Sequence, residues 1–508
     1  MADRAIRPLV LKGKVVTFDE QRPLIEQGAV YIQPNDPGHR GRIEAVQEAR
    51  DPVPAGFDGA PTVSTDGVIY PGLIDLHNHV AYNLISLWTP VGHPEPYDTR
   101  YQWTDNKGYD PEVQNPTNAL CKAVGKALLK YVETKAIVGG VTAIQGSTKT
   151  GLHPYEGWLV RNVEFETFGT EKKSVFQSAL PFRDEAGYES AHRHLEAGQA
   201  YVYHLCEGRD HDKLRGEYTS VRDHDCLQPT FVAIHTNALG SGEYQEWAPK
   251  GGTIVWSPFS NLWLYGQTTD VLAADQAGLR LCLGADWSPS GSKNLLGELK
   301  VADMWNRSQL DRHFGDEQLC RMATSNPADA LGWSEQLGRL RAGLHGDVLI
   351  TTDREPDAYR NLITAIERDV QFVAINGEPF YGTAQLMKAA GAQNDESIDV
   401  GPLHRRIVLI YPGIKDADMG WQEAVDDLRL ARRDPNAARK RTEAKADGAP
   451  LELEPDKPWD QGKQAHLSDA TTGQTDSLTH DTRYFDAIDA ATIHGGRLGN
   501  LRAYYERR

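Results

Sequence analysis

The sequence contains little cysteine and no long apolar segment. Only five of its 508 residues are cysteine, and no two of them stand in a CxxC pair. This excludes a disulfide framework and a zinc ribbon, and it is typical of a protein from a reducing compartment. No segment approaches the roughly 18 consecutive apolar residues of a membrane span, and the first residues lack the apolar core of a secretion signal. We therefore expect a cytoplasmic protein without membrane contact.

Positive charge is also scarce. The chain has 54 Lys and Arg residues against 71 Asp and Glu residues, which gives a formal net charge of −17. Because proteins that bind the nucleic-acid backbone need a basic surface, we expect a small-molecule partner and no nucleic acid. The phosphate-binding loop, the GxGxxG turn after a strand and the GxSxG elbow are absent as well, which removes three common kinds of active site.

The chain is long enough for a large catalytic domain and an accessory domain. Residues 1–70 consist of brief segments rich in valine and isoleucine, broken by glycine, proline or aspartate, and the same texture returns in residues 338–395. Such segments are typical of short strands. We predict that the two ranges form one discontinuous small β-sandwich.

Residues 71–337 show a different pattern, in which apolar strand-like runs alternate with longer helical stretches. Buried strands joined by helices indicate a parallel sheet, and about 265 residues suit a (β/α)8 barrel of the TIM type. The predicted fold class is therefore α/β. The eight candidate strands are HNHV, VTAIQG, NVEFETFG, SVFQSAL, YVYHLCEG, FVAIHTNA, TIVWSPFS and LCLGAD.

Residues 396–508 are predicted to form a C-terminal extension. An amphipathic helix is expected in DMGWQEAVDDLRLARR, and a polar, charge-rich stretch follows it. Segments of that composition do not build a core of their own. We expect this stretch to wrap the barrel or to contact a second copy in a homodimer.

Two histidines follow the apolar run that opens the barrel. His77 and His79 are two residues apart, and in a strand such side chains point to the same side, which in a barrel is the lumen. His192 and His194 have the same spacing but lie in a helical segment. There they would point to different faces, and we interpret them as solvated surface residues.

Three more polar residues end apolar runs: His204, His235 and Asp286. Each alone would more often be structural, but barrel enzymes build their sites at the carboxyl ends of their strands. A buried carboxylate there is costly unless it meets a metal ion or a donor. Together with His77 and His79, these residues predict one metal centre.

The sequence is similar to the amidohydrolase superfamily, in the branch that contains cytosine deaminase, guanine deaminase, imidazolonepropionase and the triazine hydrolases. The similarity covers residues 8–380 and rests on the order and context of seven segments. These are PGLIDLHNH, GGVTAIQG, HLCEG, AIHTNAL, WSPFSNLWLYG, GADWSPSGSKNLLGELKVA and ATSNPADALGWSEQLGRLRAGLHGDVLI.

The resemblance implies a role for each candidate residue. His77, His79, His204 and Asp286 match the metal ligands, and His235 matches the histidine that either binds the metal weakly or holds its hydroxide. Glu207 matches the acid that hydrogen-bonds a ring nitrogen, and Asn261 falls where relatives often contact the substrate. Members with two metal ions carry a lysine at the end of the fourth strand, which SVFQSALPF lacks. One divalent ion is therefore expected, Zn²⁺ by preference, with Fe²⁺ as the alternative.

The implied reaction is hydrolysis of a non-peptide C–N bond in a small cyclic or amidine-type molecule, as in a deaminase. A metal-bound hydroxide would attack carbon, Asp286 would accept the water's proton, and His235 would steady the developing oxyanion. Glu207 would protonate the adjacent nitrogen, which requires that burial raise its pKa. Ring opening or dechlorination of a heterocycle by the same site is an alternative, and a metal-free assembly protein is another.

Aromatic residues are frequent in the segments next to these strand ends. Trp88 and Trp287 are the candidates for stacking on a flat substrate. The others in these segments are Tyr82, Tyr97, Tyr101, Trp103 and Trp263, any one of which could simply anchor a loop.

Overall fold

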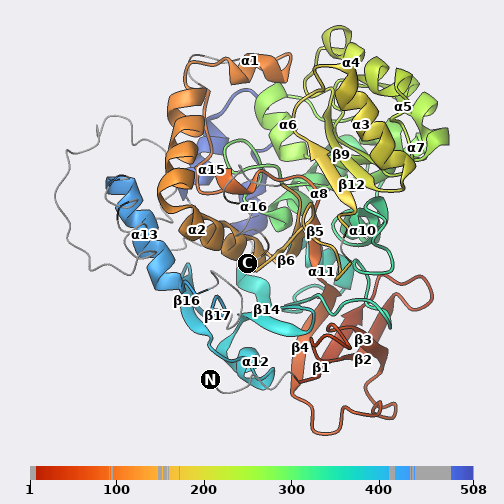
Figure 1. Ribbon diagram of the computed structural model, residues 1–508, viewed down its shortest axis with the longest axis vertical. Helices are drawn as coiled ribbons and strands as arrows, with labels where there is room; N and C mark the ends of the chain where they lie inside the picture. The colour runs from red at the N-terminus through yellow and green to blue at the C-terminus, as the bar shows by residue number, and fades with distance from the viewer. Residues whose placement is uncertain are drawn as a thin grey trace.

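The computed structural model describes most of the chain. The described residues are 7–410, apart from 91, 93–94, 147–151, 153–156, 158 and 171, together with 418–434, 436, 440 and 482–506. The molecule has two parts, a barrel surrounded by helices and a smaller sheet below it in the view of Figure 1. No helix in the described part of the chain is long and apolar enough to cross a bilayer.

The barrel strands all run parallel, and the α/β barrel expected from the sequence is confirmed. Pairing gives the orders β5-β6-β7 and β12-β11-β10-β9-β8, and a parallel bridge between Asn78 and Asp286 joins the first strand region to the last. The strands are β5 (Leu73–Asp75), β6 (Val141–Ile144), β7 (Arg161–Asn162), β8 (Val175–Ser178), β9 (Ala200–Leu205), β10 (Phe231–His235), β11 (Thr253–Trp256) and β12 (Arg280–Leu283).

The strand sequences are continuous apolar runs because both faces of a parallel barrel sheet are buried. Side chains from strands all around the barrel meet in one cluster, which includes Ile74, Val202, Ile234, Val255 and Cys282. Residues from so many strands can meet only in the lumen. The lumen is therefore a packed apolar core below the level of the polar residues that end the strands.

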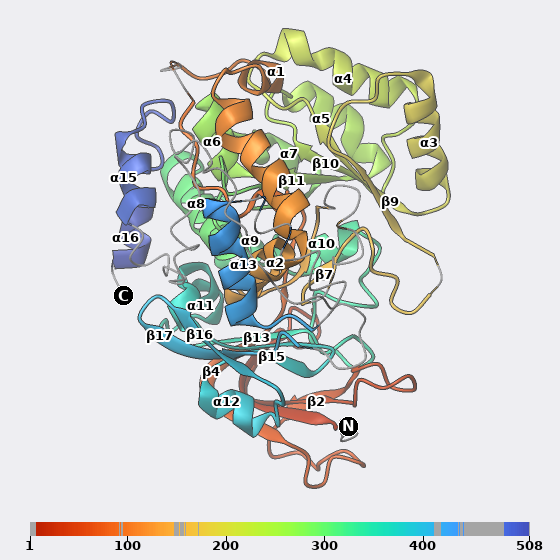
Figure 2. The same cartoon turned by 60° about the vertical axis from the view of Figure 1, so that its left-hand side comes forward.

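The helices of the barrel pack around these strands on the outside (Figure 2). Several begin with an Asp or Asn whose side chain accepts a hydrogen bond from the helix's third residue, as helix N-caps do. The helices are α1 (Arg100–Thr104), α2 (Asn115–Val138), α3 (Glu185–Glu196), α4 (His211–Asp223), α5 (Ser241–Trp247), α6 (Pro258–Tyr265), α7 (Val271–Ala277), α8 (Leu295–Gln309), α9 (Asp316–Arg321) and α10 (Ser325–Ala330). His192 and His194 lie in α3, the helix expected for them.

The smaller part is one nine-stranded sheet in which the two ends of the barrel sequence meet. The strand order is β16-β17-β15-β14-β13-β4-β1-β2-β3, and β13 pairs antiparallel with β4. The strands are β1 (Leu9–Val16), β2 (Leu24–Ile32), β3 (Ile43–Glu48), β4 (Thr62–Pro71), β13 (Val348–Thr351), β14 (Val370–Ile375), β15 (Glu378–Gly382), β16 (Glu396–Val400) and β17 (Leu403–Ile407). The helices α11 (Ala358–Thr364) and α12 (Ala384–Ala389) connect its strands.

Strand pairing carries this sheet past residue 395, the boundary expected from the sequence. Tyr381 of β15 pairs with Ile407 of β17, and β16 pairs with β17. The difference arises because β16 alternates charged and apolar residues on a half-exposed edge, a pattern that lacks the long apolar runs of the other strands. Residues 396–407 therefore lie in the sheet and not in the C-terminal extension.

The extension itself packs against the barrel in two places. The helix expected in residues 418–433 is α13 (Trp421–Arg433), and Trp421 stacks on Tyr131 of α2 with ring centroids 5.8 Å apart. The last helices, α15 (Thr482–Ala490) and α16 (Leu501–Glu506), lie beside α6 and α8 (Figure 2). Apart from residues 436 and 440, the predicted polar stretch between them lies outside the described residues.

A buried ion pair ties the barrel to the small sheet. Arg161 of β7 donates two hydrogen bonds to Asp347, of 2.8 and 3.0 Å, and both side chains are almost fully buried. We expect Arg161→Met to lower the free energy of unfolding by about 3–5 kcal/mol, because Asp347 would be left buried without its partner. Urea unfolding followed by circular dichroism measures this change.

The matched control is Arg341→Met. Arg341 pairs with Glu335 at 2.8 Å, but its side chain is 41% exposed, and such surface pairs contribute about 0–1 kcal/mol. Equal losses of stability in the two variants would contradict the assignment of Arg161 as the link between the two parts.

Candidate active site

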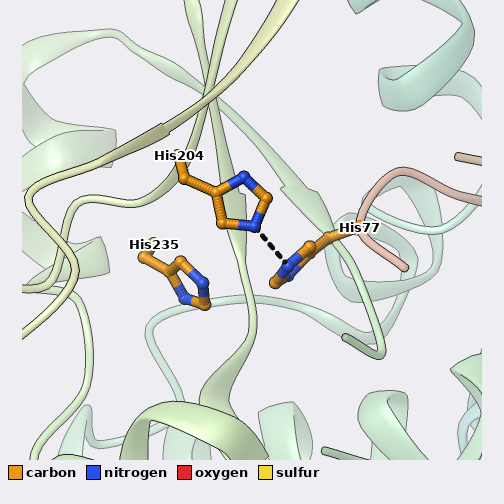
Figure 3. Close-up of side chains that lie close together, drawn as sticks. All are labelled: His77, His204 and His235. Atoms are coloured by element: carbon orange, nitrogen blue, oxygen red, sulfur yellow. Dashed lines mark hydrogen bonds between the residues drawn. The ribbon is translucent and has the colours of Figure 1, made fainter. Parts of the chain in front are cut away.

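Four histidines meet at the carboxyl ends of three barrel strands. The ring centroid of His77 lies 4.7 Å from that of His235, 4.9 Å from that of His204 and 5.4 Å from that of His79. Figure 3 shows His77, His204 and His235 turned toward one another, with a dashed line between the first two. The structure thus brings together imidazoles that lie far apart in the chain, from His77 to His235.

Asp286 completes this group, which we call the histidine cluster. Its Oδ1 lies 3.2 Å from Nε2 of His77 and 3.5 Å from Nε2 of His79. Nε2 of His204 lies 3.1 Å from Nε2 of His77. Two overlapping groups of ligand atoms, His77 with His204 and His235, and His77 with His79 and Asp286, each lie within 4.8 Å of one another and could hold a metal ion.

The first strand ends earlier than the sequence pattern indicates. β5 stops at Asp75, so His77 and His79 lie in the loop that follows it, and strand alternation does not set their directions. A network around Asp75 sets them instead. Its carboxylate accepts hydrogen bonds from the backbone N–H of His77 at 3.3 Å and of Ala285 at 3.1 Å. The loop that carries the two histidines is thereby tied to the loop that carries Asp286.

His235 and Asp286 both have a left-handed backbone, with φ of +69° and +61°. This conformation is uncommon for residues other than glycine and is concentrated at functional sites. It has a clear consequence at His235. Ile234 belongs to the lumen cluster, so a regular strand would send the next side chain outward. The positive φ breaks the alternation and lets the His235 ring join the cluster.

Burial controls the protonation of the cluster. It lowers the pKa of His79 and of His235 to about 4, and the pKa of His77 and His204 falls well below the ordinary value for the same reason. Burial raises the pKa of Asp286. Imidazoles that remain neutral at pH 7 keep a lone pair for a metal ion, and a buried carboxylate needs a cation beside it. The donor set therefore fits a divalent metal ion such as Zn²⁺.

Glu207 differs from the sequence-based expectation. Burial alone would raise its pKa, but His235, Arg100 and a hydrogen bond from Tyr265 outweigh burial and lower it. The Tyr265 hydroxyl donates to Oε1 at 2.6 Å, and Nη1 of Arg100 lies 3.1 Å from Oε2. The expectation that burial keeps Glu207 neutral is therefore wrong, because the burial brings three stabilising groups with it. Glu207 is a carboxylate at neutral pH.

Arg100 is a site residue that the sequence reasoning missed. Its guanidinium is buried, and its charge lowers the pKa of His77, His79 and His204. Its backbone N–H donates to the carbonyl of Glu207 at 3.0 Å. The capping box around Thr99, at the start of α1, is a sequence signal for that helix. No local pattern indicates that the next residue turns toward the barrel.

The three candidate substrate contacts lie in different surroundings. Trp287 is beside the cluster, with its ring 5.5 Å from that of His79 and 4.9 Å from that of Tyr82. Trp88 is buried further out, and its indole donates to Glu112 at 2.9 Å. Asn261 is fully buried behind His235, with its amide engaged by protein groups. Trp287 is therefore the aromatic candidate that lies beside the histidine cluster.

Comparisons with known proteins agree with this geometry. A model described as the amidohydrolase family matches residues 194–379. The 5-methylthioadenosine/S-adenosylhomocysteine deaminase of Syntrophobacter fumaroxidans is 24% identical over 386 residues, which are 68% of this chain and 85% of the relative.

Two solved structures share the fold. An adenosine deaminase from Xanthomonas campestris with bound zinc has a TM-score of 0.57 at 19% identity, covering 75% of this chain and 97% of its own. A variant of the atrazine chlorohydrolase of Arthrobacter aurescens, with zinc and atraton, has a TM-score of 0.60 at 17% identity. The match covers 73% of this chain and 95% of that structure's chain. At these identities the likeness concerns the fold alone.

A parallel barrel whose strand ends gather imidazoles and a carboxylate defines a class of metal-dependent hydrolases. Residues 194–379 of this chain match the amidohydrolase family, in agreement with the resemblance of its motifs to the amidohydrolase superfamily. It is an enzyme that uses a divalent metal ion to hydrolyse non-peptide C–N bonds of small molecules. The enzyme class expected from the sequence is confirmed.

Proposed function

We propose that the enzyme is a zinc-dependent deaminase that releases ammonia from a flat amino-substituted nitrogen heterocycle. The observation that carries this proposal is the convergence of three imidazole nitrogens and Asp286 beside the Trp287 ring. The relatives named as 5-methylthioadenosine/S-adenosylhomocysteine deaminases and as a guanine deaminase of Mus musculus support a purine-type ring.

His77, His79, His204 and Asp286 would hold one zinc ion. Their donor set of three nitrogens and one oxygen suits Zn²⁺, and the ion supplies a Lewis acid that ionises water near pH 7. The hydroxyl of Ser257 lies 2.7 Å from Nδ1 of His77. A hydroxyl that accepts there leaves the lone pair on Nε2, which faces the cluster.

The chain's own residues would move the two protons of the attacking water. Glu207, which is ionised, takes up the first proton and delivers it to the ring nitrogen beside the reacting carbon. Asp286 takes up the second and delivers it to the departing amino group, so that ammonia leaves and the ring carbon keeps the oxygen. His235 lies 3.6 Å from Glu207 through Nε2 and would stabilise the charge that develops on that oxygen.

Trp287 would stack on the substrate ring. We expect Trp287→Ala to raise KM about 3–10-fold with a smaller change in kcat, because aromatic pairing contributes about 0.5–1.5 kcal/mol beyond its buried area. Steady-state kinetics of ammonia release measure the effect. Trp287→Phe, which keeps an aromatic ring, is the matched control, and an unchanged KM in the alanine variant would place the substrate elsewhere.

The proposed activity is tested with a panel of heterocycles. The panel contains adenosine-type, guanine-type and cytosine-type amines together with a chlorotriazine and a cyclic amide. We expect ammonia release from one of the amines by zinc-loaded protein, no turnover after chelation, and recovery when zinc is restored. Chloride release or ring opening without ammonia would replace deamination by one of those reactions, and turnover that survives chelation would contradict a metal-dependent site.

A cytoplasmic location and a homodimer are further parts of this proposal. The five cysteines all lie in the described part of the chain and form no disulfide there, which supports a reducing compartment. Light scattering on the purified protein tests the dimer, and a mass of one chain would contradict it.

A further inference from the structure

The two ring nitrogens of His235 have different surroundings. Nδ1 lies 3.0 Å from Nδ2 of Asn261, and Nε2 lies 3.6 Å from Oε2 of Glu207. A neutral imidazole carries a hydrogen on only one of its two nitrogens. A hydrogen-bond donor facing one nitrogen leaves that nitrogen bare and places the hydrogen on the other. The orientation of the Asn261 amide therefore decides what His235 can do.

A chain of hydrogen bonds fixes that orientation. The indole N–H of Trp256 can only donate, and it donates to the hydroxyl of Thr268 at 2.7 Å. The Thr268 hydroxyl keeps its own hydrogen, which it donates to Oδ1 of Asn261 at 3.2 Å. The Thr269 hydroxyl also lies near Oδ1, at 3.4 Å. The amide oxygen thus faces the two threonines, and the amide NH₂ faces His235.

The consequence for His235 follows from donor and acceptor matching. Because the Asn261 NH₂ donates to Nδ1, Nδ1 must offer its lone pair, and the single hydrogen must sit on Nε2. Asn261, Trp256 and His235 are almost completely buried, so solvent does not compete for these bonds.

We propose that Asn261 is a positioning residue that holds His235 as the Nε2–H tautomer. In this form Nε2 is a hydrogen-bond donor directed toward Glu207 and has no lone pair for a metal ion. His235 therefore stands apart from the ligand set of His77, His79, His204 and Asp286. The effect of this tautomer on rate rests on the proposed function, whereas the tautomer itself does not.

The test uses nitrogen NMR of metal-free protein labelled with ¹⁵N-histidine. His235→Asn identifies the His235 signals by their loss. We expect wild-type Nδ1 to lack a hydrogen and Nε2 to carry one. A wild-type His235 with its hydrogen on Nδ1 would overturn the proposal, whatever reaction the enzyme performs.

Asn261→Asp provides the second measurement, since aspartate has the same shape but can only accept. We expect the hydrogen to move to Nδ1 and kcat for ammonia release to fall about 10²–10⁴-fold, with KM and bound zinc nearly unchanged, by analogy with the loss that follows a tautomer change in serine proteases. An unchanged tautomer and rate would overturn the proposal.

Thr268→Val is the companion variant, because it removes the donor that orients the amide and leaves Asn261 in place. It should allow the amide to turn over and produce a mixture of His235 tautomers, with a smaller loss of kcat. A pure Nε2–H signal in this variant would show that the chain from Trp256 does not orient the amide. Should Asn261→Asp fail to fold, the wild-type and Thr268→Val spectra still decide.

Discussion

Replacing Asp286 with asparagine is expected to lower kcat/KM for ammonia release by about 10³–10⁴-fold. An asparagine keeps the shape but can neither take up a proton nor offset the charge of a bound cation, and proton transfer by a positioned side chain is itself worth 10²–10⁴-fold. The carboxylate lies 3.2 and 3.5 Å from the ring nitrogens of His77 and His79. Steady-state kinetics measure the loss of activity. Elemental analysis measures the loss of bound zinc that we expect with it.

Asp275→Asn is the matched control for this prediction. Asp275 is partly exposed and pairs with His313 at 2.8 Å, on α7 outside the barrel. The Asp275→Asn variant should have the same kcat/KM and the same zinc content as the wild type, within error. Activity near the wild-type level in Asp286→Asn would mean that Asp286 is not part of the reacting group.

Replacing Arg100 with methionine is expected to move the acidic limb of the kcat/KM profile to higher pH. Arg100 is one of the groups that hold the pKa of Glu207 below its ordinary value. Removal of the guanidinium raises that pKa, so the ionised form that accepts the proton is lost at a higher pH. The measurement is kcat/KM from pH 4 to pH 9.

Arg209→Met is the control for Arg100, since Arg209 follows the end of β9 two residues after Glu207. Its guanidinium is 39% exposed and pairs with Asp98 at 3.0 Å. We expect its pH profile to match that of the wild type. An acidic limb at the same pH in Arg100→Met and in the wild type would show that Arg100 does not control the ionisation of Glu207.

Much of the barrel could be predicted because its signal is local. Strands such as AYVYHL and FVAIH are buried along their whole length, and burial on both faces leaves a continuous apolar run in the sequence. The polar residue that ends each run then stands out. The role of each of these residues was inferred from the resemblance to a known family, because neither composition nor spacing indicates it.

The rest of the site depends on contacts between distant segments. The charge state of Glu207 is influenced by Arg100, from α1, and by Tyr265, from α6. The direction of His235 depends on a positive φ, which breaks the strand alternation. Asn261 was expected against the substrate, whereas its amide is used within the fold. None of these features leaves a pattern in the residues next to it.

The central claim is that His77, His79, His204 and Asp286 together hold one catalytic metal ion. The most direct measurement is the anomalous scattering of a crystal of the zinc-loaded protein at the zinc edge. The account requires one peak per chain, within bonding distance of Nε2 of the three histidines and of a carboxylate oxygen of Asp286, about 2.0–2.2 Å. The absence of a peak there, or a peak bound by other residues, would contradict it.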